Sequence, residues 1–174
     1  ELYCNSEDAR YFWDRLIELG AKPTALGARD TTRMEASLPL YGHEMGECEM
    51  GGEIRIYAVP LAKFAVSFDE VKGDFIGREP LKKQFEAMKK IMNRDYSSIE
   101  DLPYRIQPIY LEGKGVLRKG FPIYCKDAWA QGKQIGYVTS GTMIPYYKTR
   151  GEGLETVFTE ETGKRSIGLA YMDS

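Results

Sequence analysis

The chain has 174 residues, enough for one large domain or two small ones whose core folds without disulfides. Its 24 basic and 26 acidic residues leave a formal charge of -2, which argues against a nucleic-acid partner because such partners select a basic surface. Three cysteines without a Cys-x-x-Cys pair and a single histidine predict reduced thiols and no metal site. No apolar run reaches the roughly 20 residues of a membrane span, so we expect a cytoplasmic protein with no membrane partner.

The first part of the chain has the periodicity of helices. Apolar residues fall on one stripe between Asn5 and Gly20, which predicts a helix that Gly20 ends. A second helix begins near Ala25, and its interleaved charged and apolar residues predict a buried helix that carries charge. The glycine-rich, acidic residues 42–52 are expected to form a loop.

Short strands and one further helix are predicted next. Residues 53–59 alternate in polarity, and residues 64–68 combine aromatic and β-branched side chains, so both are expected to be strands. A helix is predicted over 79–93, where Pro80 occupies the tolerated first turn and apolar residues recur at helical spacing.

From residue 95 onward, helical periodicity gives way to short strand patterns separated by Gly, Pro and Lys. The predicted strands are 104–111, 115–117, 122–125, 134–140, 154–159 and 167–172. The charged segment 146–165 is expected to form a protruding hairpin. These patterns predict an α+β chain with an α+β part at 1–95 and an all-β domain at 96–174.

Three blocks of sequence carry a family resemblance. Residues 27–36 read Gly-Ala-Arg-Asp-Thr-Thr-Arg-Met-Glu-Ala and 39–45 read Pro-Leu-Tyr-Gly-His-Glu-Met. Residues 73–81 read Gly-Asp-Phe-Ile-Gly-Arg-Glu-Pro-Leu, and the third block comprises 118–123 and 135–142. In this order they resemble the glycine cleavage system T protein, the aminomethyltransferase family. The resemblance implies part of an α+β folate-binding region followed by a C-terminal antiparallel β-barrel or jelly-roll-like domain.

The resemblance also implies a function. Because Glu1-Leu2-Tyr3-Cys4 resembles the tail of a family motif, we expect the chain to be the C-terminal portion of such an enzyme. The intact enzyme is expected to transfer an aminomethyl group from the lipoyl-bearing glycine cleavage H protein to tetrahydrofolate, with release of ammonia. The family's catalytic carboxylate is expected in the N-terminal part, so the chain alone is expected to be inactive.

Two other functions stay open. The family's second folate-contacting arginine has no counterpart in residues 68–72, which leaves room for a folate-dependent demethylase. A non-catalytic folate- or partner-binding module is the other alternative.

Glu35 is the strongest candidate for a binding residue. A carboxylate has two acceptor oxygens and can pair with the adjacent ring N–H and amino group of a pterin. The resemblance assigns this role to Glu35 through its place in the Arg-Met-Glu-Ala block. From the residues alone, an ion pair between Glu35 and Arg29 or Arg33 is the alternative.

The remaining candidates surround this helix. Arg29, Asp30 and Arg33 are spaced to form a local network that orients Glu35. Arg118 resembles an arginine that the family keeps near the folate, although a solvated arginine on a turn has the same pattern. Tyr41 is predicted to line the pocket or to serve only in packing.

Overall fold

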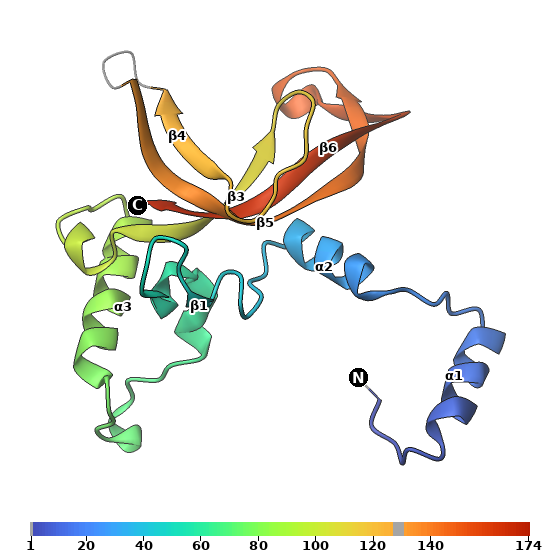
Figure 1. Cartoon of the computed structure of the whole chain (residues 1–174), viewed down its shortest axis with the longest axis horizontal. Helices are drawn as coiled ribbons and strands as arrows, with labels where there is room; N and C mark the ends of the chain where they lie inside the picture. The colour runs from blue at the N-terminus through green and yellow to red at the C-terminus, as the bar shows by residue number, and fades with distance from the viewer. Residues whose placement is uncertain (1, 127–130) are drawn as a thin grey trace.

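The computed structural model describes residues 2–126 and 131–174, and within them it confirms the predicted α+β class. Three α-helices come first in the chain, and a curled antiparallel sheet of four strands follows (Figure 1). None of the helices in these two ranges has the length and apolar character needed to cross a membrane.

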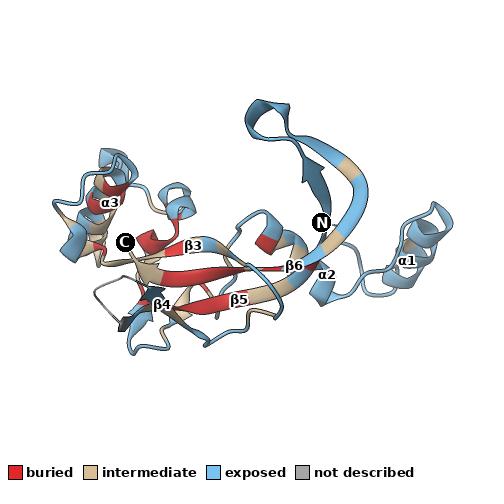
Figure 2. Ribbon diagram, turned by 90° about the horizontal axis from the view of Figure 1, so that it is seen from above, coloured by how far each residue is buried: buried red, intermediate tan, exposed pale blue. Residues whose placement is uncertain are grey.

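The helices α1 (Ala9–Glu18), α2 (Leu26–Glu35) and α3 (Arg78–Met92) confirm the three predicted helical segments. In α3 the buried residues are Ala87, Met88 and Ile91, which lie one turn or less apart as an amphipathic helix requires. In α1 no residue is buried, and the helix stands apart from the rest of the chain (Figures 1 and 2).

The expectation that α2 is a buried helix is wrong. Only Met34 of this helix is buried, and Glu35 is exposed. The helix lies against one side of the sheet, so a single stripe of its surface is covered. Arg33 is on the covered side, with its side chain 10% exposed, whereas Arg29 and Glu35 are exposed.

The chain between α2 and α3 turns more than predicted. The strands expected at 53–59 and 64–68 are wrong, because only β2 (Glu53–Ile54) is extended and 3-10 turns follow it. It pairs with β1 (Gly46–Glu47), which lies inside the segment predicted to be a loop. The short helical turns are η1 (Ile56–Ala58), η2 (Pro60–Phe64), η3 (Glu70–Lys72) and, after α3, η4 (Ile99–Asp101).

A physical reason for this difference lies in the core. Tyr57, Ala58 and Ala62 are all buried, and a strand would send alternate side chains to opposite faces. Compact turns instead bring the three residues to one side. Pro60 follows at the first position of η2, where a missing N–H is tolerated.

The sheet has the order β3-β6-β5-β4. Its strands are β3 (Tyr104–Leu111), β4 (Pro122–Lys126), β5 (Gln131–Arg150) and β6 (Val157–Asp173). The strands predicted at 104–111 and 122–125 are confirmed, and those at 134–140 and 167–172 lie inside longer strands. Residues 115–117 are not a strand, and residues 154–159 begin with the 3-10 turn η5 (Gly153–Glu155).

The predicted hairpin at 146–165 is confirmed. β5 and β6 stay paired from Gly136 opposite Met172 to Arg150 opposite Val157, which carries the far end of the hairpin well beyond β3 and β4 (Figure 2). Tyr146 lies opposite Gly163, where an added Cβ would lie 2.9 Å from the tyrosine ring. The ring therefore covers the space that a glycine leaves in a strand.

One hydrophobic core connects the helical part to the sheet. Its buried residues are Ile54, Tyr57, Ala58, Val59, Ala62, Ala87, Met88, Ile91, Leu102, Ile106, Tyr137, Leu169 and Tyr171. The cluster thus includes side chains from both sides of the boundary predicted between residues 95 and 96. The two-domain division stays a prediction.

Residues 115–117, which were predicted to be a strand, pass close to Gly141 of β5. The segment crosses the sheet at this glycine, and an added Cβ on Gly141 would lie only 2.3 Å from the backbone carbonyl oxygen of Leu117. The Leu117 N–H donates to Ser166 Oγ at 2.9 Å, so the segment is tied to β6 by a side chain. A glycine at 141 is needed for this crossing.

We expect Gly141→Ala to destabilise the chain by about 1 to 3 kcal/mol, because the new methyl group would displace backbone atoms. Gly27→Ala is the matched control. Gly27 lies in the first turn of α2 with open space around it, so the same substitution there should stabilise by up to about 1 kcal/mol. Chemical denaturation of both variants measures the two free energies, and equal effects would contradict the crossing.

Candidate functional site

A buried ion pair lies at the centre of the candidate site. The side chain of Glu44 is fully buried and that of Arg33 is 10% exposed, and Arg33 Nη1 lies 2.8 Å from Glu44 Oε2. Arg33 also contacts Asp30, with Nε donating to Oδ1 at 2.8 Å. A buried charge is tolerated only when it is paired and hydrogen-bonded, and Arg33 satisfies this from two sides.

Every oxygen of Glu44 has hydrogen-bond donors. Oε2 accepts from Arg33 and from the Leu40 backbone N–H at 2.9 Å. Oε1 lies 2.6 Å from Ser140 Oγ and 2.7 Å from Thr139 Oγ1, both of them hydroxyl donors on β5. Such complete satisfaction makes the carboxylate a rigid junction between segments.

The junction fixes α2 to the sheet. Arg33 Nη2 donates to Ser140 Oγ at 2.8 Å, and the hydroxyls of Thr31 and Thr142 lie 3.3 Å apart. His43 Nδ1 lies 3.2 Å from both the Thr139 carbonyl oxygen and Ser140 Oγ. The C-terminal end of α2 is thereby held beside β5 and β6.

The predicted local network is found in part. Asp30 and Arg33 form their i, i+3 pair, but the ion-pair alternative for Glu35 is contradicted, because neither Arg29 nor Arg33 pairs with it. Among the described residues, no hydrogen bond or ion pair reaches the Glu35 side chain. Glu44 takes its place as partner of Arg33, although sequence reasoning did not select it.

Glu35 lines a cavity of about 290 Å³ between the end of α2 and the strands β3 and β6. The strand side supplies apolar and aromatic surface together with one cation, from Pro108, Ile109, Tyr110, Arg165, Ile167 and Gly168. A carboxylate beside flat apolar surface suits a planar ligand that presents hydrogen-bond donors at one edge.

The backbone beside Glu35 is strained. Glu35 is the last residue of α2, where a negative charge faces the negative end of the helix dipole. Ser37 follows with φ of 55°, and the Leu38 N–H closes the helix on the Arg33 carbonyl at 2.8 Å. This is a Schellman ending that usually has glycine at the position of Ser37. Strain and an unpaired carboxylate at one cavity are typical of a binding site.

The other predicted residues line different surfaces. Arg29, Asp30 and Arg33 lie along a wider cavity of about 740 Å³ with Leu26, Leu38 and Leu40. This wider cavity opens on the α2 side, whereas Glu35 lines the smaller one by β3 and β6.

Tyr41 lines a third cavity of about 290 Å³ together with Lys119, whose Nζ donates to the Gly42 carbonyl at 3.0 Å. Arg118, one residue earlier, is exposed and lines none of the three cavities. Lys119, and not the predicted Arg118, lines the cavity with Tyr41. The structure brings neither predicted residue to the cavity of Glu35.

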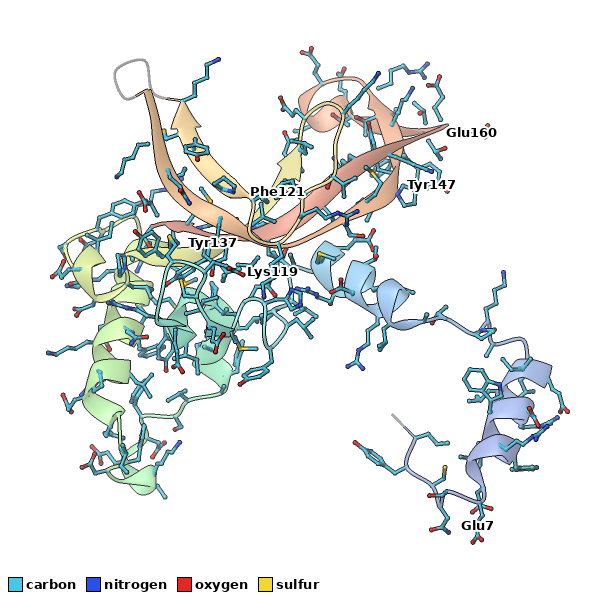
Figure 3. The ribbon with its side chains drawn as sticks, viewed as in Figure 1. Glu7, Lys119, Phe121, Tyr137, Tyr147 and Glu160 are labelled. Carbon is cyan, nitrogen blue, oxygen red and sulfur yellow. The ribbon has the colours of Figure 1, made fainter. Side chains whose placement is uncertain are left out.

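Tyr137 of β5, labelled in Figure 3, bonds two residues that line the Tyr41 cavity, Cys48 and Glu49. Its hydroxyl accepts from the Glu49 N–H at 3.2 Å and donates to Cys48 Sγ at 3.6 Å. Burial, reinforced by the contact with Cys48, raises the pKa of Tyr137, so the phenol stays neutral and keeps its proton for the sulfur.

Comparison with known proteins gives relatives along the whole chain. Aminomethyltransferase from Halalkalibacterium halodurans is 39% identical over 178 residues, which cover 100% of this chain and 37% of that protein. The aminomethyltransferases of Staphylococcus saprophyticus and Anoxybacillus flavithermus are each 37% identical, over 99% and 100% of this chain. The chain is homologous to part of the aminomethyltransferase, or T protein.

This aminomethyltransferase-like chain spans 37 to 38% of the length of these relatives. No protein-family model matches it. Homology at this identity confirms the T-protein resemblance of the sequence blocks, and it leaves the activity of the whole enzyme to be proposed.

We expect Glu44→Gln to destabilise this aminomethyltransferase-like chain by about 3 to 5 kcal/mol, because an amide leaves Arg33 uncompensated in a buried position. Glu35→Gln removes the same charge nine residues away, from an exposed side chain without a partner among the described residues, and should change stability by no more than about 0.5 kcal/mol. Urea denaturation of both variants measures the difference. A large loss for Glu35→Gln would restore the ion-pair alternative.

Proposed function

We propose that the chain is the C-terminal, folate-contacting portion of an aminomethyltransferase of the glycine cleavage system. The whole enzyme would take the aminomethyl group from a lipoyl-bearing carrier, the H protein, and pass its carbon to tetrahydrofolate. Ammonia leaves, the lipoyl thiol is freed, and methylenetetrahydrofolate forms. The contribution of this chain is to bind and orient the pterin. The folate nitrogens are thereby placed in a fixed geometry relative to the methylene carbon of the aminomethyl group.

The carboxylate of Glu35 is the observation that carries this proposal. It has no partner among the described residues, it stands at the unfavourable end of a helix, and it lines a cavity with flat apolar walls. The buried Arg33–Glu44 pair holds that helix end in place. A pterin edge with two N–H donors would supply hydrogen bonds to both carboxylate oxygens. These bonds would also offset the repulsion between the carboxylate and the negative end of the helix dipole.

The H protein is proposed to meet a basic face of α3. Lys82 and Lys83 are exposed, and Lys89 pairs with Glu86 at 2.7 Å across the same helix. An acidic carrier would be attracted to such a face, with an on-rate that falls as salt is added.

Titration of tetrahydrofolate against Glu35→Gln tests the proposed role. The amide replaces one acceptor by a donor that faces the donors of the ligand, and a charge-assisted bond is worth about 1.5 to 3 kcal/mol. Affinity should therefore fall roughly ten- to a hundredfold with an unchanged melting temperature. Glu160→Gln, an exposed position on the hairpin, is the control and should leave affinity unchanged (Figure 3).

Equal affinities for the two variants would remove Glu35 from the folate site. A demethylase of the same family would pass this test as well, and the one-carbon donor accepted by the whole enzyme distinguishes the two. Folate binding that survives without turnover of either donor would support the non-catalytic module.

A further inference from the structure

Arg165 of β6 is the other charged residue that lines the Glu35 cavity. Its guanidinium carbon lies 4.7 Å from the centre of the Tyr146 ring and 5.9 Å from that of Tyr110. Contact with two aromatic faces restricts the planar group without using its N–H donors. Arg165 is thus held in place with its hydrogen-bonding capacity free.

The two charges of the cavity are left unpaired. In the described ranges, no ion pair or hydrogen bond is found for Arg165, and none joins it to Glu35. Elsewhere in the same ranges, cations such as Arg33, Lys89 and Lys148 have carboxylate partners. An acceptor and a donor that share one cavity without meeting each other suit a ligand that meets both.

We propose that Arg165 is a second ligand-binding residue of this cavity and that it recognises a carbonyl oxygen adjoining the donor edge taken by Glu35. The ligand class is a planar heterocycle with a 2-amino-4-oxo edge. Glu35 accepts from the amino group and the neighbouring ring N–H, and Arg165 donates to the carbonyl oxygen beside them. The inference rests on the proposed function, because it deepens the same site.

General recognition chemistry supports this division of roles. Arginine reads the carbonyl oxygen of guanine with its N–H fork, and carboxylates accept from amino groups on base edges. Replacing the carbonyl by an amino group would present a donor to the donors of Arg165. The arginine therefore makes the cavity selective for an oxo over an amino substituent.

The experiment compares two probes, a 2-amino-4-oxopterin and a 2,4-diaminopteridine, by calorimetry on the 174-residue chain. The unmodified chain should prefer the oxo probe. Arg165→Gln should weaken binding of the oxo probe about tenfold and change binding of the diamino probe little, so that the ratio of the two affinities falls about tenfold. A part of the preference remains with Glu35, because the diamino probe also lacks the ring N–H that this carboxylate accepts. Lys164→Gln is the matched control, since the adjacent strand residue faces the opposite side of the sheet.

Melting temperatures recorded beside the titrations separate binding from folding. If Arg165→Gln does not fold, Arg165→Lys keeps the charge over the tyrosine rings but lacks the planar fork, and it should also reduce the preference for the oxo probe. An equal loss for Lys164→Gln would overturn the inference.

Other outcomes distinguish the two proposals. If Glu35→Gln weakens binding of the oxo probe and Arg165→Gln does not, the proposed function stands and the role of Arg165 is refuted. If the unmodified chain binds neither probe, both proposals fail for this chain.

Discussion

The buried pair between Arg33 and Glu44 is the interaction on which the arrangement of this chain depends. It joins the last turns of α2, the turn before β1 and the middle of β5, through Ser140. Replacement of a buried pair by apolar residues is often neutral, but removal of one partner is not. In the folded chain, Arg33 and Glu44 each need the other as a partner, and Ser140 bonds both of them. These contacts fix the position of α2 on the sheet.

The curled sheet supplies the other half of the constraint. Long pairing between β5 and β6 carries the core residues Tyr137 and Leu169 and, further along β6, the cavity residues Arg165 and Ile167. Gly141 lets a crossing segment approach the sheet closely enough for Leu117 to bond Ser166. The strand side of the Glu35 cavity, formed by β3 and β6, is held by the pairing of the sheet. Its helix side, formed by the end of α2, is held by the Arg33–Glu44 ion pair.

Stability and the proposed function make opposite demands on the end of α2. An unpaired Glu35 at a helix C-terminus and a left-handed Ser37 are both unfavourable for folding. A ligand with hydrogen-bond donors would offset the unfavourable charge of Glu35.

The apolar surface of α1 is uncovered, with Trp13 55% and Leu16 50% exposed. The T-protein relatives are longer than this chain, which covers 37% of them.

The sequence by itself determined most of the local elements and the choice of Glu35 as the candidate carboxylate. Periodicity placed α1, α3 and β3, and the Arg-Met-Glu-Ala block singled out Glu35, because both signals are carried by residues close together in the chain. Only the tertiary structure decided the rest. The turns after β2 form because Tyr57 and its neighbours must reach one core, and Glu44 meets Ser140 across 96 positions of sequence. Sequence patterns record spacing along the chain, whereas the partner of a buried charge is selected by desolvation in the folded chain.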